Sequence, residues 1–151
     1  MGKDDLKITG GTYRITAKSK AVEANDSIHI ADGTLDLVAG TDGLHAENDD
    51  DDSLGYIYIA GGSIAIQAGD DAIHAVSAVQ INDGTISITA AEGSEATYIQ
   101  INGGTIRVTG SSSFDCDGTA QYNGGTIIVN GQQIDYIPRS EEHTSELQSR
   151  E

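Results

Sequence analysis

Apolar residues recur along this chain in short alternating runs, and each pair of runs flanks a glycine-containing turn. Isoleucine, leucine or valine occupies most second positions on both sides of the turn, and the residues between are mostly polar. This period of two is typical of strands that bury one face. The turns give six strand–turn–strand units, anchored at Gly11, Gly33, Gly62, Gly84, Gly104 and Gly125.

The spacing of these anchors predicts a solenoid. Successive anchors are 22, 29, 22, 20 and 21 residues apart, and no helical periodicity interrupts them. A period near 20 residues fits a coil whose strands pair with the same strands of the next coil. We therefore expect an all-β fold, a parallel β-helix of about six coils of 20–22 residues. The abrupt start of the first coil suggests a fragment of a longer solenoid.

Two further columns support the stacking. The anchor glycines should supply turn conformations that a side chain would penalise. Two positions before the anchor, Asn82, Asn102 and Asn123 fall in register, which predicts a ladder of side-chain amides.

The character of the sequence changes at Arg139, where the alternation of apolar and polar residues ends. Residues 139–151 lose the periodicity, and they resemble the translation of a common sequencing-library adapter. We therefore expect two segments, a β-helix over 1–138 and a non-native or disordered tail over 139–151 that contributes no site residue.

Composition narrows the functional classes. The net charge of −16 argues against nucleic-acid binding and against anionic membranes. The single cysteine, Cys116, excludes an internal disulfide, and no apolar run is long enough to cross a bilayer. Abundant Asp, Asn, Gly and Thr with little Lys is common in extracellular bacterial solenoids, so we expect an extracellular or cell-surface location.

Acidic residues cluster in two turns. Asp42 and Asp71 share a column nine residues after the anchor, with Asp70 beside them, and an acidic insertion follows the first turn. Stacked carboxylates repel unless a cation separates them, and oxygen ligands suit calcium. The predicted calcium ligands are Asp42, Glu47, Asn48, Asp49, Asp70 and Asp71. The alternative is a solvated acidic loop, particularly for the run from Asp49 to Asp52.

His45 and His74 occupy equivalent positions on neighbouring coils, with Glu23 next in line. Two histidines without cysteine make a weak zinc pattern, so we assign them a structural role in the turns.

One outward face is rich in tyrosine and amide side chains. Such a face offers aromatic rings to sugar C–H surfaces and hydrogen-bond donors to hydroxyls. The predicted carbohydrate-binding residues are His29, Tyr56, Tyr58, Gln80, Tyr98 and Gln100. Ordinary exposed strand residues, with glutamines favoured by stacking alone, are the alternative.

The units Gly-Asp-Asp-Ala-Ile-His-Ala (69–75) and Thr-Asp-Gly-Leu-His-Ala-Glu-Asn (41–48) resemble a bacterial family of carbohydrate-binding β-helix domains whose founding type comes from a cellulolytic clostridium. The resemblance covers about residues 3–131. It implies a right-handed parallel β-helix similar to pectate lyases, bound calcium, and non-catalytic binding of cellulose or acidic plant polysaccharide such as polygalacturonate. The chain would then be part of a larger multidomain surface protein.

Two other functions remain open. A pectate-lyase-like β-eliminase would need calcium and a basic residue to remove a proton, and Lys20 shares the column of Asp42 and Asp71. A salt bridge to neighbouring aspartates would explain Lys20 more simply. A structural stalk or adhesin segment is the third possibility.

Overall fold

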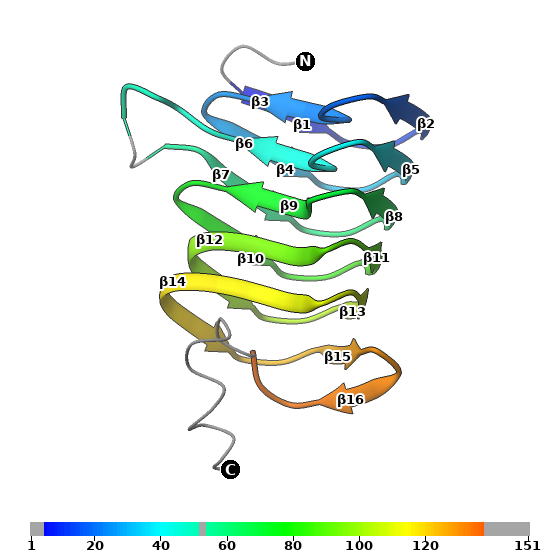
Figure 1. Cartoon of the computed structure of the whole chain (residues 1–151), viewed down its shortest axis with the longest axis vertical. Helices are drawn as coiled ribbons and strands as arrows, with labels where there is room; N and C mark the ends of the chain where they lie inside the picture. The colour runs from blue at the N-terminus through cyan, green and yellow to red at the C-terminus, as the bar shows by residue number, and fades with distance from the viewer. Residues whose placement is uncertain (1–4, 52–53, 138–151) are drawn as a thin grey trace.

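The chain winds into a right-handed parallel β-helix (Figure 1), as the periodicity and the resemblance predict. The computed structural model describes residues 5–51 and 54–137, and within them every regular element is a strand. No helix in that part of the chain could span a membrane. The strands are β1 (Asp5–Ile8), β2 (Thr12–Ala17), β3 (Val22–Ala24), β4 (Ser27–Ile30), β5 (Thr34–Ala39), β6 (Leu44–Ala46), β7 (Tyr56–Ile59), β8 (Ser63–Ala68), β9 (Asp71–Ala75), β10 (Ala78–Ile81), β11 (Thr85–Thr89), β12 (Glu92–Ile101), β13 (Thr105–Thr109), β14 (Ser112–Tyr122), β15 (Thr126–Val129) and β16 (Gln132–Ile134).

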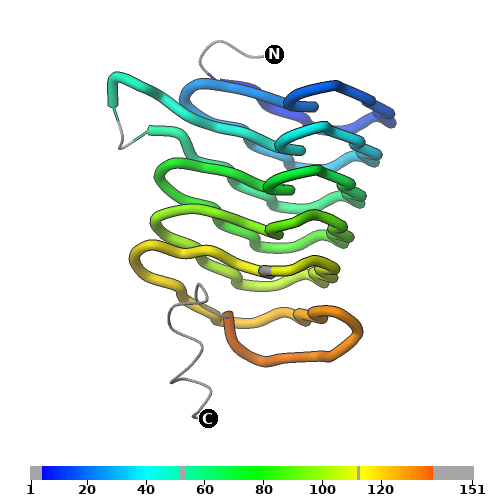
Figure 2. The backbone as a smooth tube through the Cα atoms, in the orientation of Figure 1, coloured from blue at the N-terminus to red at the C-terminus, as the bar shows by residue number. Residues whose placement is uncertain are grey.

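Three strands per coil give the rod three faces. The β4–β7–β10 face also contains β1 and the C-terminal parts of β12 and β14, all paired in parallel. The β6–β9–β12 face contains β3, β6, β9 and the N-terminal parts of β12 and β14. The β5–β8–β11 face also contains β2, β13 and β15. The last strand, β16, pairs antiparallel with β15 at the edge of this face. The coils are stacked in chain order (Figure 2).

The inward residues stack into one apolar core. Ile28, Ile57, Val79 and Ile99 pair across successive strands and are each at most 1% exposed. Because side chains alternate across a strand, this inward column leaves the residues on either side of it facing outward. The core therefore fixes which residues can form a binding surface on each face.

The anchor glycines adopt the predicted turn conformation. Gly62 has a φ of +100°, and a Cβ added there would lie 2.8 Å from the backbone oxygen of Gly33 on the preceding coil. A side chain therefore meets both backbone strain and a steric clash at this position.

We expect Gly62→Ala to lower the free energy of unfolding by at least about 1–2 kcal/mol, the cost of the left-handed conformation alone. Gly10→Ala is the matched control, because a Cβ there meets no atom of residues 5–51 or 54–137 within 4 Å. Urea unfolding of the two variants measures the difference. Equal stability of the two variants would contradict this account of the turns.

The predicted asparagine ladder is confirmed. Asn123 donates to Asn102 Oδ1 and Asn102 donates to Asn82 Oδ1, each at 2.7 Å. Asn82 in turn donates to the hydroxyl of Tyr58 at 2.6 Å, so the ladder continues into the β4–β7–β10 face.

The long step of 29 residues between Gly33 and Gly62 contains a loop between β6 and β7. This loop projects from the rod (Figure 1). The loop is anchored at Asp26, whose carboxylate accepts a bond from Asn48 Nδ2 at 2.7 Å and whose backbone oxygen accepts from Gly55 N at 2.8 Å. Asp52 of the acidic run and the predicted tail, 139–151, lie outside the described residues.

Candidate functional sites

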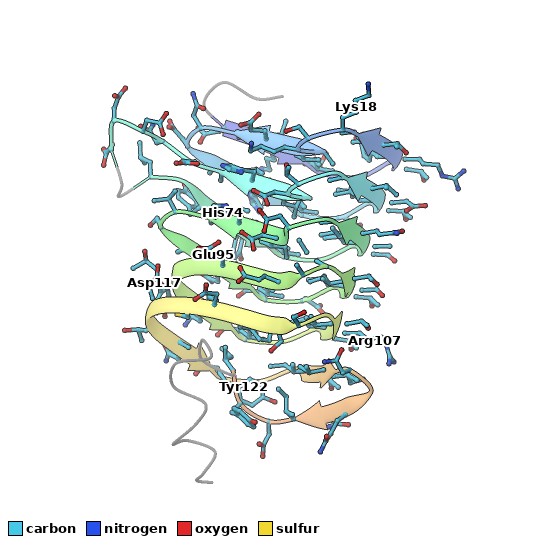
Figure 3. The ribbon with its side chains drawn as sticks, viewed as in Figure 1. Lys18, His74, Glu95, Arg107, Asp117 and Tyr122 are labelled. Atoms are coloured by element: carbon cyan, nitrogen blue, oxygen red, sulfur yellow. The ribbon has the colours of Figure 1, made fainter. Side chains whose placement is uncertain are left out.

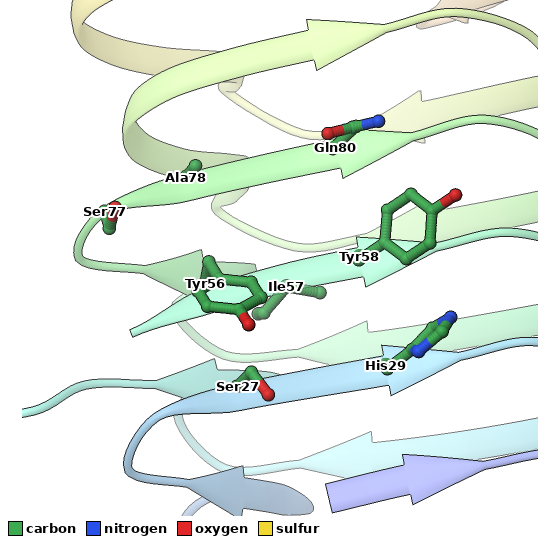
Figure 4. Close-up of a pocket in the computed structure, with 8 residues that line it drawn as sticks. All are labelled: Ser27, His29, Tyr56, Ile57, Tyr58, Ser77, Ala78 and Gln80. Carbon is green, nitrogen blue, oxygen red and sulfur yellow. The ribbon is translucent and has the colours of Figure 1, made fainter. Parts of the chain in front are cut away.

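The predicted carbohydrate-binding residues lie together on the β4–β7–β10 face. One outward column contains His29, Tyr58, Gln80 and Gln100, and the neighbouring column contains Tyr56 and Tyr98. Figure 4 shows Tyr56 and Tyr58 on β7, between the side chains of β4 and those of β10. Strand register thus brings together residues that are as far as 71 positions apart in the sequence, from His29 to Gln100.

A shallow groove follows this face. Its volume is about 350 Å³, and its outward-facing lining includes Tyr56 and Ala78. Tyr56 is 42% exposed, whereas Ala78, its neighbour on β10, adds little bulk. The exposed ring therefore borders an open space on the next coil.

Hydrogen bonds hold the other two rings in place. The Tyr98 hydroxyl donates to Gln121 Oε1 at 2.8 Å, and the Tyr58 hydroxyl accepts from Asn82. Tyr58 also contacts the ring of His29, with centroids 4.8 Å apart and planes tilted by 52°. Because the Tyr58 hydroxyl accepts that bond, its own proton remains to be donated to a ligand.

The acidic residues and two histidines gather on the β6–β9–β12 face. Strand register places Glu23, His45, His74, Glu95 and Asp115 in one column. A second set of acidic residues lies three positions before His45, His74 and Glu95. Asp42 is in the turn before β6, whereas Asp71 and Glu92 are the first residues of β9 and β12. Figure 3 shows His74 and Glu95 on neighbouring coils of this face.

Asp42 is the centre of a buried hydrogen-bond network. Its Oδ2 lies 2.8 Å from His45 Nδ1 and 3.3 Å from His74 Nδ1, and its Oδ1 accepts from Asp71 N at 3.1 Å. Burial alone would raise the pKa of Asp42, but these hydrogen bonds outweigh it and hold the pKa well below the ordinary value. The bond to Asp42 is also the main cause that raises the pKa of His74.

Asp71 has the opposite electrostatic environment. Burial, together with the neighbouring carboxyl groups of Glu95 and Glu92, raises its pKa to about 10. Its Oδ1 is buried and has no hydrogen-bond partner among the described residues. Ligand atoms of Asp71 and Glu95 lie within 4.8 Å of each other, and the same holds for Glu92, Glu95 and Asp115. The arrangement suits a cation, which would remove the repulsion.

The pKa values predict how stability depends on pH when no cation is bound. The pKa of Asp71 is 3.8 in the unfolded chain and about 10 in the folded chain, so between these pH values the folded state holds a proton that the unfolded state has lost. Stability therefore falls as pH rises between these values, and His74, with its raised pKa, acts in the same direction above neutrality. Each proton contributes at most about 1.4 kcal/mol per pH unit.

Urea unfolding of chelated protein between about pH 5 and pH 9 measures this slope. Asp71→Asn should show a smaller slope because it removes the buried acid. A free energy of unfolding that rises with pH in the chelated parent would contradict the assignment.

The predicted calcium ligands separate into two groups. Asp42 and Asp71 are in contact, and Glu47 Oε1 joins them through His45 Nε2 at 2.9 Å. Asp70 and Asp49 are exposed and belong to none of the metal-ligand groups of the described residues. Asn48 uses its amide for Asp26 and its oxygen for the backbone N–H groups of residues 50 and 51. The assignment of all six residues as calcium ligands stays a prediction.

Glu92, Glu95 and Asp115 were missed by the sequence reasoning. The strands before them, β11 and β13, have five residues, whereas β5 and β8 have six. As a result Glu95 lies eleven residues after its anchor, whereas His74 lies twelve after its own, and a fixed offset misaligns the later coils. An alignment of the coils that allows a one-residue deletion in the later coils would have placed these residues in the columns of Asp71 and His74.

The histidines and Lys20 also differ from expectation. His45 and His74 lie within β6 and β9 and not in the turns, and their rings are 4.8 Å apart. The expected salt bridge of Lys20 is wrong, because no ion pair within 4 Å joins it to an aspartate among residues 5–51 and 54–137. Cys116 is buried and bonds to backbone oxygens of Thr97 and Thr119.

The comparisons with known proteins give one finding. A family model described as "carbohydrate-binding domain-containing protein" matches residues 1–135. No curated protein and no solved structure matches the chain.

Proposed function

Because the chain belongs to the family of carbohydrate-binding domain-containing proteins, we propose that its β4–β7–β10 face binds a linear, neutral polysaccharide without catalysis. The observation that carries this proposal is the placing of Tyr56 and Tyr98 in one outward column, with Ala78 between them. Two strand spacings separate the two rings along the rod, or roughly 9.6 Å. This distance is close to the disaccharide repeat of an extended β-1,4-linked glucan such as cellulose.

The spacing gives the glycan an orientation. A chain lying along the rod axis would present alternate sugar rings to Tyr56 and Tyr98, and the small side chain of Ala78 would leave room for the ring between. Stacking against tyrosine buries sugar C–H groups, while Gln80 and Gln100 in the next column offer amides to the hydroxyls. The groove of about 350 Å³ around Tyr56 would hold one end of this contact.

The charges on this face favour a neutral glycan over an acidic one. Along the two outward columns of the face, the basic side chains are Lys7 and His29, and Asp5 is acidic. A polyuronate carries one carboxylate per sugar, and the described face does not supply a matching row of cations. The strongly acidic chain as a whole adds further repulsion.

We also propose that calcium supports the fold from the β6–β9–β12 face. The residues that would hold it are Asp71, Glu92, Glu95 and Asp115. The buried Asp71 Oδ1, which has no hydrogen-bond partner in the described part of the chain, fits the demand of calcium for oxygen ligands. Calcium would neutralise these carboxylates and link three coils. Extracellular calcium modules bind with Kd values of roughly 10⁻⁴–10⁻³ M, which accords with a secreted or surface-displayed bacterial protein.

Native affinity electrophoresis of the full chain tests the proposed function. Gels containing soluble hydroxyethyl cellulose should retard the protein strongly, and gels containing polygalacturonate should retard it weakly. Both results should hold in calcium and in chelator, provided that circular dichroism shows a folded protein under each condition. Retardation by polygalacturonate alone would overturn the neutral assignment, and no retardation in either gel would overturn glycan binding on this face. Release of unsaturated uronides, detected by ultraviolet absorbance, would overturn the non-catalytic assignment.

A further inference from the structure

We propose that Asp42, His45 and His74 form a binding site for a divalent transition-metal ion of the zinc class. The three side chains come from the turn before β6, from β6 and from β9, so the site would bridge two neighbouring coils. It adjoins the proposed calcium site, because Asp71 of that site lies beside His74, but none of its three ligands is among the proposed calcium ligands. It does not depend on glycan binding.

The distances are close to those of a coordination shell. Zinc binds imidazole nitrogen and carboxylate oxygen at 2.0–2.2 Å, so two ligand atoms of a tetrahedral site lie roughly 3.3 Å apart. Asp42 Oδ2 is 2.8 Å from His45 Nδ1 and 3.3 Å from His74 Nδ1, and all three ligand atoms lie within 4.8 Å of one another. Only small movements would be needed to admit an ion.

The ligands are held before any ion arrives. Asp42 and His45 are 5% and 6% exposed, and the other oxygen of Asp42 accepts the backbone N–H of Asp71 at 3.1 Å. That bond aims Oδ2 at the two histidines. The side chain of His74 is 25% exposed and gives the site its contact with solvent. A further donor, Asp71 Oδ2, lies 3.5 Å from His74 Nδ1.

The second ring nitrogen of His45 supplies an independent argument. His45 Nε2 lies 2.9 Å from Glu47 Oε1, so the ring has a carboxylate at each nitrogen. A neutral imidazole has one N–H and cannot donate to both, so this arrangement needs either an imidazolium or a metal ion in place of one proton. With a metal ion at Nδ1, the Nε2–H donates to Glu47, which is the carboxylate–histidine–metal arrangement typical of protein metal sites.

The donor set discriminates between metals. Calcium prefers six to eight oxygen ligands, whereas two imidazole nitrogens with one carboxylate suit zinc and its neighbours among the transition metals. The carboxylates on the next coils add negative charge around the site, which favours a divalent cation. The β6–β9–β12 face would therefore hold a nitrogen-rich site above an oxygen-rich one.

Isothermal titration of the metal-free full chain with zinc chloride, with a parallel calcium titration, tests the proposal. We expect one zinc ion per chain in the parent and at least about a tenfold loss of zinc affinity in His45→Gln, with calcium binding unchanged. Glu47→Ala should lose zinc affinity by about 10–100-fold, the usual cost of removing such a partner. Cobalt in place of zinc should give the visible absorption of a tetrahedral site in the parent and lose it in His45→Gln.

The controls separate this site from its surroundings. The other two histidines of the chain, His29 and His143, should be replaceable by glutamine without loss of zinc affinity. Glu95→Gln should weaken calcium binding and leave the cobalt spectrum unchanged. Zinc affinity that survives in His45→Gln, or that disappears in His143→Gln, would overturn the proposal, as would a parent that binds no zinc.

Discussion

The double variant Tyr56→Ala/Tyr98→Ala is expected to lose measurable binding to cellulose-type glycans, and each single variant to lose at least about tenfold in affinity. Burial of a large apolar side chain contributes about 1.5–3 kcal/mol, and 1.4 kcal/mol corresponds to a factor of ten in Kd. Both rings lie in one outward column of the β4–β7–β10 face. The variants should still fold, because Tyr56 is 42% exposed and its ring contributes little to the core.

Tyr13→Ala is the matched control for these variants. Tyr13 is 40% exposed, almost the same as Tyr56, but it lies on β2 of the first coil, in the inward column of Leu35 and Ile64, away from the β4–β7–β10 face. Affinity electrophoresis in hydroxyethyl cellulose should show no change for Tyr13→Ala. If Tyr13→Ala weakens binding as much as Tyr56→Ala does, the glycan contacts tyrosines without regard to face, and the proposed surface is wrong.

Calcium is expected to raise the free energy of unfolding by about 2.7 kcal/mol at a concentration of one hundred times its Kd. The gain arises because calcium binds the folded carboxylate cluster and relieves its repulsion. Glu95→Gln should abolish most of this gain. The same substitution should leave the chelated protein as stable as the parent or more stable, since it removes one of the carboxylates that raise the pKa of Asp71.

Thermal or urea unfolding of the parent and of Glu95→Gln, each with calcium and with chelator, measures both effects. Glu23→Gln is the control, because Glu23 occupies the same column on the first coil but belongs to none of the metal-ligand groups among the described residues. A parent that gains no stability from calcium, or a Glu95→Gln variant that gains as much as the parent, would contradict the calcium assignment.

The regular part of the molecule could be predicted from the sequence because its determinants are local and repeated. The inward and outward columns follow from the alternation of side chains along each strand, so the tyrosine columns on β7 and β12 were predicted correctly. The glycine turns and the asparagine ladder were predicted for the same reason, since identical residues recur at identical offsets.

The acidic face could be predicted only in part. Counting from the anchors aligned Asp42 with Asp71, but the shorter strands β11 and β13 shifted Glu92 and Glu95 out of the assumed column. The sequence also does not show that Asp71 is buried while Asp70 beside it is exposed. The hydrogen bonds from His45 and His74 to a single oxygen depend on side-chain rotamers, which a column of residue types does not determine.

A titration of the ¹⁵N-labelled full chain with a β-1,4-linked gluco-oligosaccharide, followed by backbone amide chemical shifts, shows which face of the β-helix contacts the glycan. We expect shifts along β4, β7, β10 and the C-terminal part of β12, largest near Tyr56, Tyr58 and Tyr98, with β2, β5 and β8 unchanged. Shifts confined to the β5–β8–β11 or β6–β9–β12 face, or no shifts from a folded protein at saturating oligosaccharide, would contradict glycan binding on the β4–β7–β10 face.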